Sequence, residues 1–107
     1  MNRELAARRP KAGIYWAEMG DKLNRMSRYG EALPCLLKAR ERGLGSRFFY
    51  WGNIGDTYYF LGMKEEAVNA YRNYLDLMVQ QKSAEYRAKY SDAVKEAEAR
   101  IREMESQ

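Results

Sequence analysis

The side chains that most often carry out chemistry are scarce in this sequence of 107 residues. Histidine is absent and Cys35 is the single cysteine, which excludes histidine-based catalytic triads, the usual zinc sites and an intramolecular disulfide. The adjacent acids Glu65 and Glu66 are typical of the first turn of a helix, where carboxylates interact favourably with the helix dipole. No glycine-rich loop that could cradle a phosphate is present. We therefore expect a protein that is not an enzyme and that has no catalytic residues, metal site or cofactor.

The composition indicates a folded domain with an uneven charge distribution. Hydrophobic residues make up 46% and charged residues 32%, enough apolar content for a core and enough charge for a soluble surface. Residues 1–47 hold 11 basic and 5 acidic side chains, whereas residues 48–107 hold 8 and 10. The basic half could attract an acidic partner, although scattered charge that aids solubility is the simpler interpretation. Because no recognition-helix or stacking-sheet motif is present, we do not expect a nucleic-acid partner.

Membrane and export signals are missing from the sequence. No apolar run approaches the roughly 20 residues needed to span a bilayer. The first ten residues, MNRELAARRP, lack the apolar stretch of a signal peptide. We expect a cytoplasmic protein that does not insert into a membrane.

The elements that must position any site are revealed by an internal repeat with an offset of 35 residues. A tryptophan, a mid-helix glycine and a later alanine recur in each copy. The matching pairs are Trp16 and Trp51, Gly20 and Gly55, and Ala32 and Ala67. Glycine inside a helix costs about 1 kcal/mol relative to alanine. We therefore predict that a partner helix approaches closely at Gly20 and Gly55.

Apolar residues at spacings of three and four predict four amphipathic helices, followed by one long, mostly polar helix with a narrow apolar stripe. Their predicted ranges are 13–26, 28–42, 47–61, 64–79 and 84–105. Short links make neighbouring helices antiparallel. The polar last helix is suited to closing a stack of repeats.

The recurring pattern resembles the tetratricopeptide repeat, whose order is tryptophan, an apolar residue and glycine, a second large residue, and then alanine. Residues 13–47 and 48–82 resemble two copies, 83–107 a capping helix, and 1–12 a basic leader or the remnant of a preceding repeat. Pro10 lies where the final proline of such a preceding repeat would fall, so the chain is either part of a longer array or has a short leader. The resemblance implies an all-α fold, in which antiparallel helix-turn-helix repeats form a short right-handed α-solenoid.

The resemblance also implies a concave groove, lined by the first helix of each repeat, that binds a peptide or a helical segment of a partner protein. Periodicity in the third helix directs Trp51, Ile54, Gly55, Tyr58 and Leu61 to the core, and in the first helix it leaves Ile14, Ala17 and Arg25 exposed. The residues that we predict to contact the partner are Asp21, Asn24, Phe49, Gly52, Asn53, Asp56, Tyr59, Phe60 and Arg87. For Phe60, a place in the core or under the last helix is the alternative.

The expected function is therefore that of an adaptor or scaffold that binds another protein. The alternative is a structural repeat that assembles with itself, because the same aromatic groove could hold a second copy of the chain.

Overall fold

The computed structural model describes residues 12–80 and 83–107, and all regular secondary structure in these ranges is helical. The prediction of an all-α protein is confirmed. The predicted leader lies outside the described residues except for Ala12. The helices are α2 (Ala12–Arg25), α3 (Tyr29–Glu41), the short 3-10 helix η1 (Leu44–Ser46), α4 (Phe48–Phe60), α5 (Lys64–Gln80), α6 (Ala84–Lys89) and α7 (Ser91–Glu105).

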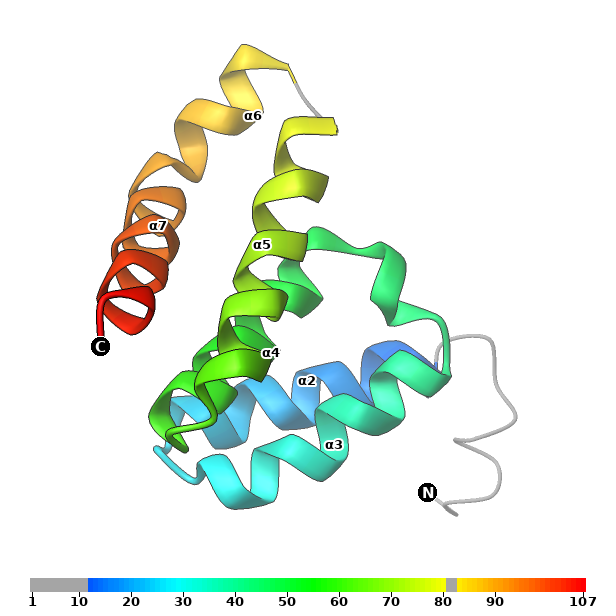
Figure 1. Ribbon diagram of the computed structural model, residues 1–107. Coiled ribbons are helices and arrows are strands. Elements are labelled where there is room, and N and C mark those ends of the chain that lie inside the picture. The colour runs from blue at the N-terminus through cyan, green and yellow to red at the C-terminus, as the bar shows by residue number, and fades with distance from the viewer. Residues whose placement is uncertain (1–11, 81–82) are drawn as a thin grey trace.

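The helices form two antiparallel hairpins with α6 and α7 alongside the second (Figure 1). The first hairpin pairs α2 with α3 and the second pairs α4 with α5. Helix α4 also packs against α2 and α3, whereas α7 packs mainly against α5. Helix α4 therefore lies at the centre of the fold, in contact with both helices of the preceding hairpin.

The turns between the paired helices repeat the same geometry 35 residues apart. Ser27 and Gly62 both adopt a positive φ, 59° and 76°, at the end of α2 and α4. After α2, Arg28 N donates to Leu23 O at 2.9 Å, and after α4 the equivalent Met63 N donates to Tyr58 O at the same distance. These bonds, with those from Ser27 to Asn24 and from Gly62 to Tyr59, form the Schellman motif that ends a helix on a left-handed residue.

The two mid-helix glycines lie at close contacts between paired helices, as predicted. A Cβ added at Gly20 would come within 2.6 Å of the Leu36 side chain, and one added at Gly55 would come within 2.8 Å of the Tyr71 ring. Leu36 and Tyr71 are again 35 residues apart. The contact between a glycine of one helix and a large side chain of its paired helix therefore recurs with the sequence repeat.

We expect Gly55→Ala to lower the free energy of unfolding by about 1–3 kcal/mol, although alanine is the better helix former. Tyr71 is 2% exposed and its hydroxyl is hydrogen bonded to Asp56, so its ring has little room to move. Gly30→Ala in α3 is the matched control, because a Cβ there meets no atom within 4 Å. Its stability should be unchanged or raised by up to about 1 kcal/mol. Urea denaturation followed by circular dichroism would measure both, and equal stabilities would contradict the close contact at Gly55.

The core is centred on α4, and its largest fully buried side chains are Tyr50, Tyr71, Leu36, Ile54 and Thr57. The predicted core face of α4 is right for Ile54, Gly55 and Tyr58 but incomplete, because Phe48, Tyr50 and Thr57 are also buried. Leu61, predicted to face the core, is instead 39% exposed, and Trp51 is half-buried. A helix that contacts α2, α3 and α5 buries more than one face, which a single apolar stripe does not anticipate.

The Tyr50 hydroxyl is buried and has no hydrogen-bond partner among the described residues. Burial raises the pKa of Tyr50 to about 12, so the phenol remains neutral at ordinary pH.

Two further expectations were wrong. The single helix predicted over 84–105 is interrupted at Tyr90, where φ is −105° and ψ is 14°, and it forms α6 and α7 instead. Ala17, predicted to be exposed, is 5% exposed and belongs to the main core cluster, because α4 packs against α2.

Within residues 12–80 and 83–107, no helix combines the length and apolar character needed to cross a bilayer.

Candidate functional site

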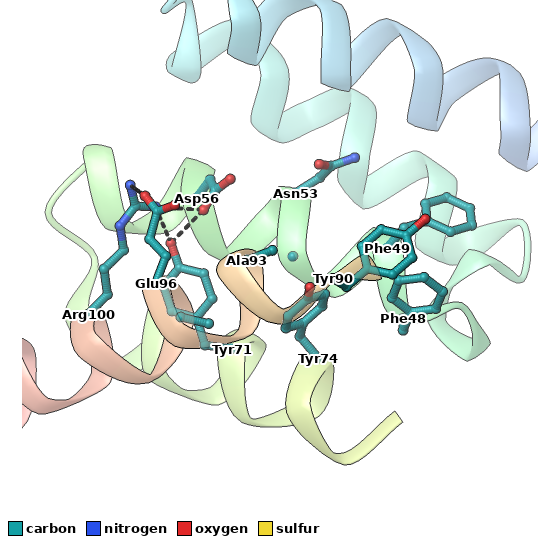
Figure 2. Close-up of a pocket in the computed structure, with 12 residues that line it drawn as sticks. Phe48, Phe49, Asn53, Asp56, Tyr71, Tyr74, Tyr90, Ala93, Glu96 and Arg100 are labelled. Atoms are coloured by element: carbon teal, nitrogen blue, oxygen red, sulfur yellow. Dashed lines mark hydrogen bonds and ion pairs between the residues drawn. The ribbon is translucent and has the colours of Figure 1, made fainter. Parts of the chain in front are cut away.

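An open cavity of about 210 Å³ lies between the second hairpin and α7 (Figure 2). Helix α4 contributes one wall with Phe49, Gly52, Asn53 and Asp56. These four residues are among those predicted to contact a partner, and their spacing of three and four places them on one face of the helix. Helix α7 forms the opposite wall and α5 the base. We call this space the α4–α7 cavity.

Aromatic rings gather at one end of the α4–α7 cavity (Figure 2). Phe48 is 6% exposed and lies edge-on to Phe49 at 6.0 Å and to Tyr90 at 5.2 Å between ring centroids. Tyr74 lies 6.1 Å from Phe48 and closes the base, next to Gly52. Phe49 is 40% exposed, so this aromatic end offers accessible apolar surface.

The opposite end of the cavity is a charged network from three helices (Figure 2). Asp56 Oδ1 accepts hydrogen bonds from the Tyr71 hydroxyl at 2.6 Å and from Arg100 Nη1 at 2.7 Å. Arg100 also donates to the Tyr71 hydroxyl at 2.8 Å, and its Nη2 donates to Glu96. Two carboxylates thus share one guanidinium, which leaves the polar end with a net charge of −1.

Burial is the largest cause of the pKa shifts of Asp56 and Tyr71. Desolvation raises the pKa of the Asp56 carboxyl above its ordinary value, against the lowering effect of the hydrogen bond from Tyr71 and the charge of Arg100. Burial and the neighbouring Asp56 charge raise the pKa of Tyr71 well above its ordinary value. The Tyr71 hydroxyl therefore remains protonated and can donate to Asp56.

A second hollow of about 520 Å³ lies between α2 and the loop that leads into α4. Helix α2 contributes Ile14, Glu18 and Asp21, and the loop side includes Arg47. Phe49 lines this hollow as well as the α4–α7 cavity. The two spaces therefore lie on either side of one half-exposed phenylalanine at the start of α4.

The remaining predicted contact residues are placed differently. Asn24 is used within the protein, because its Nδ2 donates to Asn53 O at 3.1 Å and its Oδ1 lies 2.8 Å from the Thr57 hydroxyl. It links α2 to α4 and is not a free groove residue. Asp21 does line the second hollow, where it also pairs with Arg25 at 3.1 Å.

Tyr59 and Phe60 meet the end of α7. The Tyr59 hydroxyl donates to Glu103 at 2.8 Å, and the Arg100 guanidinium lies 4.6 Å from the Tyr59 ring centre and 5.1 Å from that of Phe60. Phe60 is 50% exposed and stacks on Tyr29 at 4.7 Å, so it does not enter the core.

Arg87 lies on α6 and is not in the groove. It borders a separate, mostly apolar hollow between α5 and α6–α7, together with Leu75, Met78 and Val79. The interruption at Tyr90 changes the direction of the chain before α7. The prediction for Arg87 assumed one continuous helix over 84–105, so it does not apply to the separate helix α6.

Sequence reasoning missed the α5 and α7 side of the site, namely Tyr71, Tyr74, Glu96 and Arg100. The pair Glu96 and Arg100 was visible as a four-residue spacing, but its contact with Asp56 was not. One signal was available: Tyr71 stands where the first repeat has Leu36, and the hydroxyl of a buried tyrosine usually has a polar partner.

The described part of the chain contains no group of three or more acidic or cysteine side chains that could hold a metal ion. When the chain is compared with known proteins, no family model, no curated protein and no solved structure matches it.

Proposed function

We propose that this chain is a non-enzymatic protein-interaction module of the tetratricopeptide type, which binds an extended or helical segment of a partner protein along the side formed by α2, α4 and α7. The observation that carries the proposal is Phe49, a half-exposed aromatic residue shared by two cavities on either side of α4. Exposed aromatic residues in hollows are typical anchors at protein interfaces. A segment that crosses α4 at Phe49 would contact both spaces.

The repeat geometry supports the same proposal. The Schellman turns and the two glycine contacts recur at 35 residues, and each hairpin packs on its neighbour, as expected for a short α-solenoid. In such a stack, α2 and α4 are the first helices of successive repeats and α7 takes the place of the next. Cys35 is the single cysteine and is a free thiol, which is consistent with a protein that acts in the reducing cytoplasm.

The binding surface is tested by selecting peptides from a random displayed library on the purified protein and measuring their affinity for wild type and for Phe49→Ala. A peptide segment lying across this short surface would bury much less than the roughly 1,600 Å² of a standard interface, so we expect micromolar affinity, about −7 to −8 kcal/mol. Phe49→Ala should weaken binding at least about fivefold, because truncating an anchor typically costs more than about 1 kcal/mol. Val79→Ala is the control, since Val79 is 68% exposed and lies on the hollow beside α6.

Failure to recover any peptide whose binding depends on Phe49 would contradict the proposal. The alternative function, self-assembly through the same surface, would appear as dimers in light scattering that form with increasing concentration and are lost in Phe49→Ala.

A further inference from the structure

We propose that the segment bound in the α4–α7 cavity carries a lysine or arginine next to an apolar side chain, with the cation at the Asp56–Glu96 end and the apolar group among the aromatic rings. This inference rests on the proposed function, because it specifies the chemistry of the partner that the same surface binds.

The polar end favours a cation because its own cation, Arg100, is already paired with both carboxylates. Arg100 is 17% exposed, is bonded to Asp56, Tyr71 and Glu96, and lies against the rings of Tyr59 and Phe60. It cannot turn to receive a partner carboxylate without giving up these contacts. An anionic ligand would meet two carboxylates whose one nearby guanidinium is already shared between them, so like-charge repulsion disfavours it.

The carboxylates, by contrast, retain acceptor capacity. Tyr71 and Arg100 both donate to Oδ1 of Asp56, and Arg100 donates to Oε1 of Glu96. Among the described residues, Oδ2 of Asp56 and Oε2 of Glu96 are therefore left to receive an ammonium or guanidinium group. The side chains of Asp56 and Glu96 are 44% and 60% exposed, so an incoming cation can reach both.

The wider charge distribution points the same way. The cavity belongs to residues 48–107, in which acidic side chains outnumber basic ones by 10 to 8, whereas residues 1–47 are strongly basic. Lys89 Nζ lies 5.5 Å from the centre of the Tyr90 ring, which places this lysine of the protein at the aromatic end of the α4–α7 cavity. The cation of the partner is therefore expected at the opposite end, beside Asp56.

The aromatic end determines the neighbouring residue of the partner. Phe48, Phe49, Tyr74 and Tyr90 line this end of the cavity, and Tyr74 of the base lies next to Gly52 in the α4 wall. Aliphatic or aromatic side chains gain favourable contacts there. A volume of about 210 Å³ is below the roughly 300 Å³ at which pockets for whole small molecules begin, so peptide side chains fit it better.

The experiment uses the full chain and the displayed random peptide library described above. We expect the recovered peptides to carry lysine or arginine within a few residues of a large apolar residue. A recovered lysine-containing peptide is then synthesised with lysine and with norleucine, a neutral side chain of similar length. Replacement by norleucine should weaken binding to wild type about three- to tenfold.

The site of the cation is located with Glu96→Gln, which removes one negative charge but keeps a hydrogen-bond acceptor for Arg100. Glu98→Gln makes the same charge change on the same helix outside the α4–α7 cavity and is the control. Glu96→Gln should weaken the lysine peptide about three- to tenfold and leave the norleucine peptide unchanged, whereas Glu98→Gln should affect neither by more than about twofold.

Several results would contradict the inference, and they differ in whether the proposed function also fails. The inference would be overturned if the peptides whose binding depends on Phe49 are acidic or lack a basic residue. It would also be overturned if Glu96→Gln and Glu98→Gln weaken peptide binding equally. Both results would leave the proposed function standing. Dimers of the protein weakened by Glu96→Gln would overturn it in favour of a second copy as the occupant. If no peptide depends on Phe49, the proposed function itself fails, and the inference with it.

Discussion

Truncating the chain after Gln80 is expected to abolish its cooperative unfolding transition or to make the protein aggregate. Removal of α6 and α7 would expose Tyr71, Tyr74 and Met78, which are at most 5% exposed in the intact protein. It would also leave Asp56 without Arg100, so a partly buried carboxylate would lose its cation. In a stack of repeats, the terminal element must cover the apolar side of its neighbour.

The truncation is measured by thermal unfolding with circular dichroism and by light scattering. A truncated chain that remained monomeric and cooperatively folded would show that α6 and α7 are dispensable.

A pair of point variants tests the same interface in the full chain. Ala97 is 4% exposed and belongs to the main core cluster, whereas Ala99 is an exposed residue on the same helix. Ala97→Glu should separate α7 from α5, because a charge buried without a partner is strongly unfavourable. Ala99→Glu should change the stability by no more than about 0.5 kcal/mol. Similar effects of the two would argue against a docked α7.

The second large effect is expected for Trp51→Ala, which should lower the free energy of unfolding by about 3 kcal/mol, the lower end of the range for tryptophan truncation because the ring is half-buried. The indole Nε1 donates to Gly45 O at 2.7 Å, and the Arg40 guanidinium lies 5.4 Å from the ring centre. The ring also contacts Tyr50 edge-on at 5.1 Å. Trp51 therefore joins the η1 loop, α3 and α4.

Trp51→Phe separates the contributions to this effect, because it retains most of the apolar surface and loses the hydrogen bond to Gly45. It should lower the free energy of unfolding by about 1 kcal/mol through the lost hydrogen bond, and further through the weaker packing of the smaller ring. Urea denaturation measures both variants. A loss below about 1 kcal/mol for Trp51→Ala would mean that the repeat tryptophan is not a structural anchor.

Trp16, the equivalent residue of the first repeat, also packs at the edge of the core under a cation, with Lys38 at 5.1 Å. Its indole nitrogen, unlike that of Trp51, has no hydrogen-bond partner among the described residues. The two tryptophans therefore occupy similar but not identical environments, which explains why the repeat pattern predicts their packing but not their hydrogen bonds.

The sequence by itself determined helices α2 to α5 and how they pair. The predicted ranges 13–26, 28–42, 47–61 and 64–79 agree with α2 to α5 within one residue at each end. Their boundaries depend on local features, namely apolar periodicity and the turn residues Ser27 and Gly62. The glycine contacts were predictable for the same reason, since a glycine kept mid-helix indicates close packing.

Only the tertiary structure decided which of the predicted contact residues are already bonded to other side chains of the protein. Asp56 and Arg100 are 44 residues apart and meet because α7 packs on α5, and Asn24 meets Thr57 because α4 packs on α2. Such contacts depend on how whole helices cross, which periodicity within one helix does not specify. The same packing buried Ala17 and turned a predicted open groove into a cavity closed on one side by the protein's own α7.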